Sequence, residues 1–229
     1  MINQELFNNF YTTERHGYGL SDDGGPFGFD IHMALEVCYL IKMYGCDCIV
    51  ETGTNTGDTT EFLAKCFPKI DIVTCEVDGQ LYETAKKRLG GYSNVTVERM
   101  SSNELVANKV NAEFPFYFLD AHWGDYWPLA DELSHIHRGV VCVDDFDIHH
   151  SEYGYDEYNG VKNDIDLLRK YVKANCYVNN PDARYPYPLL QRRRLGGRAY
   201  YVLGREEDYL KQCERFKLFS GVNIDIVYA

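Results

Sequence analysis

Three aspartates follow two apolar segments of the chain and could bind a metal ion together. Asp120 ends the segment "FPFYFLD", and Asp144 and Asp145 end the segment "GVVCVDD". If both segments are strands of a parallel sheet, their carboxyl ends meet at one edge, and the three carboxylates converge there. Clustered carboxylates repel one another, and a hard divalent cation such as Mg²⁺ or Mn²⁺ relieves that repulsion by taking oxygen ligands.

The alternative for these three acids is that each one caps a helix or a turn. Asp145 is the weaker of the two adjacent ligands, because successive residues of a strand point to opposite faces unless the strand has already ended. The dense apolar strands that precede Asp120 and Asp144 favour the metal site.

The stretch "IVETGTNTGDTTEFL" is a second chemical signal, in which an apolar run ends in Glu51 and two glycines follow. The spacing from Gly53 to Gly57 differs from the G-x-G-x-x-G of dinucleotide-binding turns, and Asp58-Thr59 stands where a P-loop has Lys-Ser/Thr. Asp58 also places a negative charge where a phosphate would bind at a helix N-terminus. We therefore expect a ligand that approaches the backbone closely, carries no phosphate and offers a cation to Glu51. The alternative is a tight turn without a ligand.

Glu76 ends the next apolar segment, "IDIVTCEV", about one strand–helix–strand unit after Glu51. A carboxylate at this place can accept hydrogen bonds from both hydroxyls of a ribose. Ser101 and Ser102, at the end of a third apolar segment, are placed to reach an adenine edge. The alternatives are a solvated acidic loop at Glu76 and ordinary serines at a strand end.

The elements that must position these residues alternate between helix-like and strand-like patterns. Periodic apolar residues predict helices over 31–45, 58–67, 80–89, 101–111, 128–138 and 161–176. Short apolar runs predict strands over 46–52, 70–77, 94–100, 114–120 and 139–146, and the range 187–204 predicts two strands about a Gly196-Gly197 turn. We therefore expect an α/β fold with a doubly wound, mostly parallel Rossmann-like sheet and a C-terminal antiparallel hairpin.

Length and charge bound the domain count and the partners. The chain has 229 residues, of which 45% are hydrophobic, and a formal net charge of −12. This length suits one domain over 31–229, preceded by an extension over 1–30 whose Gly-rich, polar sequence suits a lid that excludes water. The acidic balance argues against a nucleic acid partner, because phosphate neutralisation needs clustered Lys and Arg.

Targeting signals and cysteine usage indicate a cytoplasmic protein. No stretch approaches the ~20 apolar residues of a membrane span, and the first residues lack the apolar core of a signal peptide. Most of the eight cysteines stand inside apolar segments, where a reduced thiol behaves as a small hydrophobe. Cys46 and Cys48 have no second pair with which to form a zinc site.

The segments "ETGTNTG" and "CEVD" resemble the first two motifs of the class I S-adenosylmethionine-dependent methyltransferases. The resemblance extends over residues 27–203, and Asn55 stands where the family usually has a central glycine. It implies S-adenosyl-L-methionine as the cofactor, which carries a sulfonium, an amino-acid tail and a ribose but no phosphate. The cofactor-binding residues would then be Glu51, Gly53, Asn55, Gly57, Thr59, Glu76, Ser101, Ser102, Asp120 and Trp123.

The segment "FLDAHW" is similar to a stretch of catechol O-methyltransferase, and its pairing with "VVCVDDF" more closely resembles the sugar O-methyltransferases that act on macrocin, mycinamicin and novobiocin precursors. This resemblance implies Asp120, Asp144 and Asp145 as ligands of Mg²⁺. The metal would bind two neighbouring hydroxyls of the acceptor and lower the pKa of the one attacked. The implied activity is O-methylation of a hydroxyl on a deoxysugar or glycan, and a catechol-like or other small diol is the alternative acceptor.

A general base should lie within reach of the attacked hydroxyl, and His122, two residues beyond Asp120, is our candidate. A structural histidine is the alternative at this position. Asp125, His149 and His150 are substitutes for the base. The His149-His150 pair also raises an iron site with two histidines and one carboxylate, although adjacent histidines rarely face one ion.

The acceptor region is marked by aromatic residues, because many of the 19 tyrosines lie outside the expected strands. Aromatic faces suit a small sugar, a glycan or a planar phenol, and packing of loops is the alternative. The apolar C-terminal stretch "FKLFSGVNIDIVYA" could form an edge strand or the contact of a homo-oligomer. The competing class of function is a non-catalytic or NAD-type nucleotide-binding protein with the same sheet.

Overall fold

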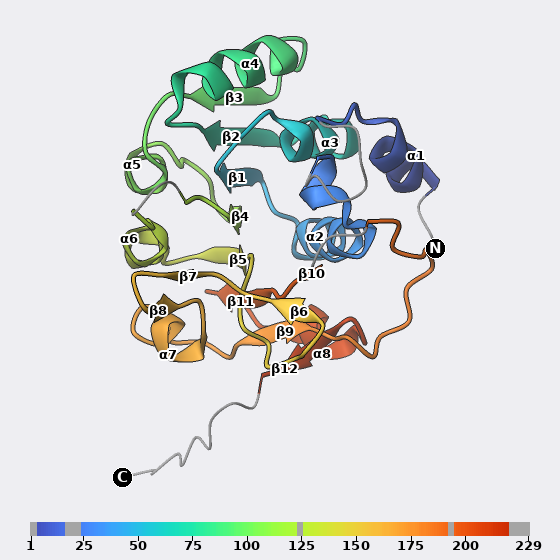
Figure 1. Ribbon diagram of the computed structural model, residues 1–229, viewed down its shortest axis with the longest axis vertical. Helices are drawn as coiled ribbons and strands as arrows, with labels where there is room; N and C mark the ends of the chain where they lie inside the picture. Colours follow the sequence, from blue (N-terminus) through green and yellow to red (C-terminus); the bar gives the residue numbers. More distant parts are fainter. Residues whose placement is uncertain (1–3, 17–23, 123–125, 192–194, 220–229) are drawn as a thin grey trace.

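An eight-stranded sheet forms the centre of the computed structural model, which describes residues 4–16, 24–122, 126–191 and 195–219 (Figure 1). The strand order is β12-β9-β11-β5-β4-β1-β2-β3, and β1 to β5 run parallel to one another. The parallel strands are β1 (Cys48–Thr52), β2 (Asp71–Cys75), β3 (Val95–Glu98), β4 (Phe116–Leu119) and β5 (Gly139–Val143). The sequence order reverses between β1 and β4, so the carboxyl ends of these two strands frame a crevice in which such sheets bind ligands.

The C-terminal part of the sheet is antiparallel. β11 (Ala199–Leu203) runs antiparallel to β5 and to β9 (Tyr177–Asn179), and β12 (Phe216–Leu218) is an edge strand paired with β9. The expected α/β, mostly parallel sheet with a C-terminal antiparallel pair is confirmed. The expected position of its first strand is wrong, because the described residues 181–191 contain no strand and β10 (Leu195–Gly196) pairs with β6 (Tyr153–Gly154) in a separate small sheet.

Helices cover both faces of the sheet (Figure 1). The helices are α1 (Gln4–Thr12), α2 (Ile31–Tyr44), α3 (Asp58–Cys66), α4 (Gly79–Leu89), α5 (Ser102–Asn108), α6 (Leu129–His135), α7 (Ile165–Leu168) and α8 (Asp208–Gln212). In Figure 1, α1, α2 and α3 lie on one side of the sheet and α5, α6 and α7 on the other, whereas α4 lies beside the edge strand β3. The expected doubly wound arrangement is thus present.

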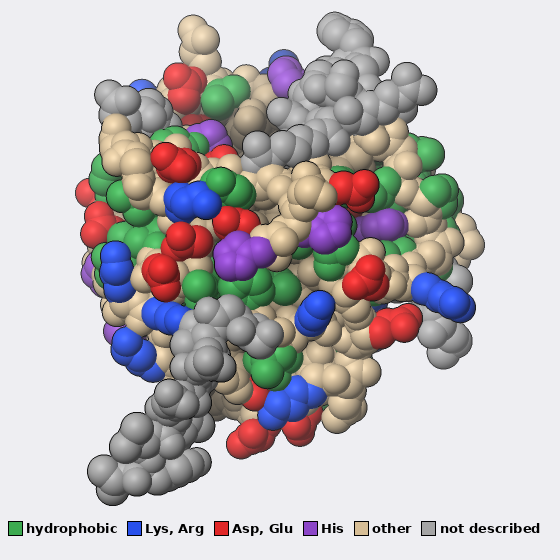
Figure 2. All heavy atoms as spheres, turned by 60° about the horizontal axis from the view of Figure 1, so that its bottom comes forward, with side chains coloured by type: hydrophobic (Ala, Val, Ile, Leu, Met, Phe, Trp, Pro, Cys, Tyr) green, Lys and Arg blue, Asp and Glu red, His purple; other side chains and the backbone are tan. Residues whose placement is uncertain are grey.

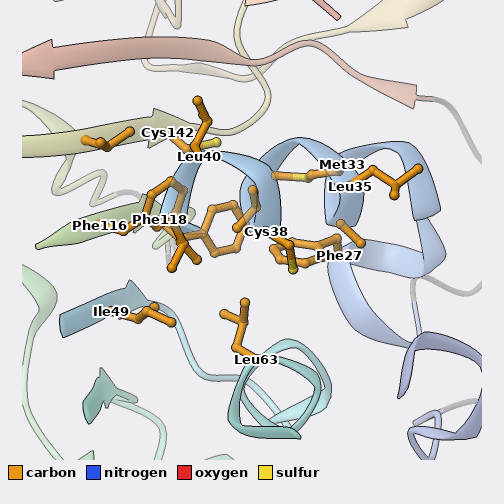
Figure 3. Packing of buried hydrophobic residues seen from close by; sticks show 14 of the residues in the cluster. Phe27, Met33, Leu35, Cys38, Leu40, Ile49, Leu63, Phe116, Phe118 and Cys142 are labelled. Carbon is orange, nitrogen blue, oxygen red and sulfur yellow. The ribbon is translucent and has the colours of Figure 1, made fainter. Parts of the chain in front are cut away.

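Alternating residues of the central strands build two cores. Phe116 and Phe118 of β4 pack toward α2 and α3, as Figure 3 shows, whereas Tyr117 and Leu119 pack with α5 and α6. All residues of β1, β4 and β5 are buried, as expected for parallel strands covered on both faces. Rigid strands covered in this way fix the positions of the loops that follow them.

The prediction of a long helix over 161–176 is wrong. The helix α7 is limited to Ile165–Leu168, and Val161–Lys162 forms strand β8, which pairs with β7 (Glu157–Tyr158). The backbone of Asn163 accounts for the late start, because its N–H donates to Asp156 and its carbonyl accepts from Asp147. The side chain of Asp164 then accepts from the backbone N–H of Leu167 and caps the short helix.

The N-terminal extension contacts the start of helix α3. Asp58 accepts hydrogen bonds from the backbone N–H of His16 and of Gly25, and Thr59 Oγ1 accepts from the N–H of Phe27 at 2.9 Å. Phe27 belongs to the short 3-10 helix η1 (Pro26–Phe29). The first turn of α3 therefore binds the backbone of the extension at His16, Gly25 and Phe27.

Among the residues that the structure describes, no helix combines the length and the apolar character that crossing a membrane requires. On the face shown in Figure 2, the coloured Lys and Arg side chains lie singly among acidic, histidine and hydrophobic ones. That face therefore carries no continuous basic patch within the described residues.

Candidate functional site

The glycine turn after β1 is tight and approaches the loop after β4. Gly53, Asn55 and Gly57 all have left-handed backbone conformations, with φ of 84°, 51° and 84°. A Cβ added to Gly53 would lie 3.3 Å from the carbonyl oxygen of Asp120, so a side chain there would crowd that loop. Asparagine tolerates the left-handed region better than most residues with a side chain, which explains how Asn55 can occupy this turn.

Glu76 closes the turn from the end of β2. Its Oε2 accepts a hydrogen bond from the N–H of Asn55 at 2.8 Å, and its Oε1 accepts from the N–H of Asp78 at 3.0 Å. A cavity of about 230 Å³ lies beside it. Several of the expected cofactor residues line this cavity, namely Gly53, Asn55, Glu76, Ser102 and Asp120, and His122 lines it too. These residues come from the ends of β1, β2 and β4 and from the start of α5.

Four expected cofactor residues do not line this cavity. Glu51 lies behind the turn, Gly57 caps the start of α3, and Ser101 caps the start of α5. Thr59 Oγ1 accepts the hydrogen bond from Phe27 described above. Trp123 lies outside the described residues, so its expected place near an adenine stays a prediction.

Glu51 is a fully buried carboxyl inside the fold. Burial raises its pKa to about 7, although hydrogen bonds from Thr60 and Thr74 act in the opposite direction. The Thr60 hydroxyl donates to Glu51 Oε2. The sequence predicts a cationic ligand for this carboxylate, but Glu51 is buried within β1 and does not line the cavity, so this ligand stays a prediction.

The three aspartates come together at the rim of the sheet. One carboxylate oxygen from each of Asp120, Asp144 and Asp145 lies within 4.8 Å of the other two, and we call this group the aspartate rim. Strand β5 ends at Val143, so the alternation of a strand no longer applies to Asp145. Asp145 has a φ of 48°, and this left-handed turn brings its carboxylate to the same side as that of Asp144.

The side chain of Asn163 holds this turn in place with two hydrogen bonds. Its Nδ2 donates to the carbonyl oxygens of Asp144 and Asp145 at 2.7 and 3.0 Å. Gly196 faces the same carboxylates, since a Cβ there would lie 2.5 Å from Asp145 Oδ1 and 3.3 Å from Asp144 Oδ1. Nothing in the sequence singled out Asn163. The glycine at 196 was noticed, but only as part of a turn.

His122 is exposed and lies next to the aspartate rim along the chain. Its ring centroid is 5.5 Å from that of Tyr158, and Tyr158 in turn lies 5.3 Å from Trp127. His149 and His150 line a different cavity, together with residues of β9 and β12, and Asp125 lies outside the described residues. His122 is therefore the one of these candidates that shares a cavity with both Asp120 and Glu76.

Glu132 is an acid near the rim that the sequence analysis missed. It lines a small cavity of about 10 Å³ together with Asp120, His122 and Asp144, and only 1% of its surface is exposed. Burial raises its pKa to about 7. The sequence pattern does indicate a buried acid here, because Glu132 falls on the apolar face of α6, between Leu129 and Ile136 at helical spacing.

The chain shares its fold with solved methyltransferase structures, although no family model and no curated protein matches it. A methyltransferase of Podospora anserina with bound S-adenosylhomocysteine aligns with a TM-score of 0.55 and 12% identity over 89% of each chain. A candidate O-methyltransferase of Klebsiella pneumoniae aligns with a TM-score of 0.53 and 13% identity over 88% of this chain and 89% of that one. The protein has the class I methyltransferase fold.

A candidate caffeoyl-CoA O-methyltransferase of Staphylococcus aureus aligns with a TM-score of 0.50 and 16% identity, over 76% of this chain and 83% of that one. Identities this low establish the fold and leave the chemistry to the site itself. In this methyltransferase fold, the cavity beside Glu76 lies at the carboxyl ends of β1 and β2, and the aspartate rim lies at those of β4 and β5.

Proposed function

We propose that this protein is an O-methyltransferase that uses S-adenosyl-L-methionine and a divalent metal ion, Mg²⁺ or Mn²⁺. The observation that carries the proposal is the aspartate rim, because three carboxylates meet within 4.8 Å and Asp120 also lines the cavity beside Glu76. A cofactor in that cavity and a metal at the rim would be neighbours, so that the methyl donor and an acceptor hydroxyl could be held close together.

The donor set of the rim fits a hard divalent cation. All three side chains offer carboxylate oxygens, which are the ligands that Mg²⁺ and Mn²⁺ prefer, and none of the three is fully buried. Asp120, Asp144 and Asp145 would hold the ion. When bound, it would supply an electrostatic attraction that lowers the pKa of an acceptor hydroxyl.

The remaining roles fall to residues around the cavity. Glu76 would accept hydrogen bonds from the ribose hydroxyls, and Gly53, which has no side chain and lines the cavity, would let the cofactor approach the backbone. His122 would take the proton of the attacked hydroxyl at a ring nitrogen. Its exposure leaves it accessible to an acceptor from solvent.

The acceptor class is supported by the aromatic side chains beside the rim. Tyr158 and Trp127 lie side by side next to His122, and the Tyr158 hydroxyl donates to Asp156 Oδ2 at 3.3 Å. Aromatic side chains arranged in this way can pack against the C–H face of a sugar, and the polar groups beside them can form hydrogen bonds with its hydroxyls. We therefore propose a sugar hydroxyl, on a deoxysugar or glycan, ahead of a catechol-like diol.

Transfer of a labelled methyl group from S-adenosyl-L-methionine tests this proposal. The assay compares a panel of deoxysugars and glycans with a panel of catechols, each with Mg²⁺ and with a chelator. Metal-dependent labelling of a sugar is the expected result. Labelling that is unaffected by the chelator would contradict the proposed metal dependence. Labelling of catechols alone would contradict the proposed sugar acceptor and indicate a catechol-like one.

We also propose a cellular location and a partner. All eight cysteines are free, which supports a reducing compartment such as the cytoplasm. The edge strand β12 is available for a homo-oligomeric contact, and size determination in solution would test it.

A further inference from the structure

A groove of about 890 Å³ lies apart from the rim, between α1, α2 and the end of α3. None of the three rim aspartates lines it. Apolar residues such as Leu6 and Leu35 form part of its wall, and Arg184 and Tyr185 close one side. Two cysteines, Cys38 of α2 and Cys66 of α3, also lie in this wall.

The two thiols lie in the same wall of this groove and interact with each other. Burial has the larger effect on the Cys38 thiol and raises its pKa, and the interaction with Cys66 raises it further, whereas the interaction with Cys38 lowers the pKa of the Cys66 thiol. Asn9 of α1 donates a hydrogen bond from Nδ2 to Cys66 Sγ at 3.6 Å. Figure 3 shows Cys38 on α2, with its side chain on the side of the helix where α3 lies.

This arrangement differs from that of the other buried cysteines. Burial raises the pKa of the Cys46, Cys48 and Cys75 thiols to about 12, so these thiols stay protonated and unreactive near neutral pH. Cys66 is only half-buried, and its interactions with Cys38 and with the Asn9 amide lower the pKa of its thiol, which favours the thiolate form. A thiolate with a second thiol in contact is the arrangement that forms disulfides readily.

We propose that Cys66 and Cys38 form an oxidisable dithiol, a modification site that a hydroperoxide converts into a Cys38–Cys66 disulfide. The Cys66 sulfur attacks the peroxide, the O–O bond breaks, and Cys66 becomes a sulfenic acid while the peroxide leaves as an alcohol or water. The Cys38 sulfur then attacks the Cys66 sulfur, the S–O bond breaks, and water leaves with the proton of Cys38. The dithiol has lost two electrons and two protons, and the peroxide has been reduced.

The disulfide would join the middle of α2 to the last residue of α3. It would thereby restrict the helix that begins at the glycine turn, and it would close a loop of the unfolded chain, which stabilises the folded state. The inference does not depend on the proposed methyl transfer, because the groove and the rim share no lining residue among those discussed.

Mass spectrometry after treatment with hydrogen peroxide tests the proposal. The expected product has lost two hydrogen masses, and its non-reduced digest contains one linked pair of peptides, which carry Cys38 and Cys66. Its melting temperature should rise by about 5 °C and return to the starting value on reduction. The Cys213→Ala variant is the matched control, because Cys213 is the other half-buried cysteine and its loss should leave the linked pair unchanged.

Single variants keep the test independent of any effect on folding. Cys38→Ala should stop at the sulfenic acid, which dimedone traps on Cys66, and Cys66→Ala should form neither product. A linked pair that contains another cysteine, dimedone labelling elsewhere, or free Cys38 and Cys66 after treatment would each overturn the proposal.

Discussion

Two groups of acidic side chains in this protein differ in how their charge is balanced. In the first, which we call the Arg198 cluster, Asp30 and Glu36 are buried and share the guanidinium of Arg198, at 2.9 Å from Asp30 and 3.0 Å from Glu36. The hydroxyls of Tyr185 and Tyr200 also donate to Glu36. In the second, the aspartate rim, three carboxylates meet at the edge of the sheet.

The difference separates a structural role from a functional one. The Arg198 cluster supplies its own cation and its own hydrogen-bond donors, so its carboxylates are satisfied within the fold and link α2 to β11. The rim instead brings three carboxylates within 4.8 Å of one another, and a divalent cation bound there would relieve their mutual repulsion. Removing a member should therefore damage stability at the first group and function at the second.

Arg198→Met should have the largest effect on stability. The variant leaves two carboxylates buried without their cation, and we expect a loss of about 3–5 kcal/mol in the free energy of unfolding, measured with urea. The matched control is Lys109→Met, which breaks the exposed pair with Glu98 and should change the same quantity by less than ~1 kcal/mol. Equal effects of the two variants would remove the distinction between the groups.

Asp144→Asn should have the largest effect on function. Because even changes behind metal ligands cost ~10–100-fold, we expect metal affinity and methyl transfer to fall by more than ~100-fold. The melting temperature without metal should stay the same or rise, since one of three like charges is gone. Asp166→Asn, an exposed site on α7, controls for the chemical change. Wild-type rates in Asp144→Asn would contradict a metal at the rim.

Glu132→Gln tests an acid that is almost fully buried beside the rim. Burial raises its pKa from 4.5 to about 7, so the folded protein binds a proton that the unfolded chain releases in this interval. The free energy of unfolding therefore falls as the pH rises from about 4.5 to 7. In the variant this fall should be smaller, and at pH 7.5 its free energy of unfolding should exceed that of the wild type by ~1–3 kcal/mol.

The remaining slope in that variant should come from Glu51, whose pKa burial also raises to about 7. Chemical unfolding between pH 4.5 and 8 measures both contributions. Glu104→Gln, at an exposed position of α5, serves as the control and should leave the slope intact. An unchanged slope in Glu132→Gln would show that Glu132 titrates normally.

Glu76→Gln should have the smallest effect of the four. A neutral amide accepts weaker hydrogen bonds than a carboxylate, so we expect the Kd for S-adenosylhomocysteine to rise about 10-fold. Calorimetric titration measures it, with Glu98→Gln at the end of the neighbouring strand as the control. A Kd that does not move would place the ribose elsewhere.

The sequence predicted the parts of the fold that depend on local patterns. Helix α2 and strands β1 to β5 follow from apolar periodicity, and parallel pairing then brings Asp120 and Asp144 to one rim. The limits of helix α7 could not be predicted, because its start depends on backbone hydrogen bonds of Asn163 with Asp147 and Asp156, which lie outside the helical pattern.

The candidate site was predictable where a residue follows a strand directly. Asp145 depended on a left-handed turn that no local pattern specifies, and Gly196 and Asn163 support the rim from segments far away in the sequence. The role of Arg198 could not be predicted for a similar reason, because its two carboxylate partners, Asp30 and Glu36, lie more than a hundred residues earlier in the sequence.

Thermal unfolding with added ligands tests the central claim most directly. The protein is melted with S-adenosylhomocysteine or NAD⁺, each with Mg²⁺ or with a chelator. At a hundredfold excess over Kd a ligand adds ~2.7 kcal/mol, which corresponds to about 5–10 °C for a chain of this size. We predict stabilisation by S-adenosylhomocysteine and a separate gain from Mg²⁺ that Asp144→Asn abolishes. Stabilisation by NAD⁺ alone would contradict the account.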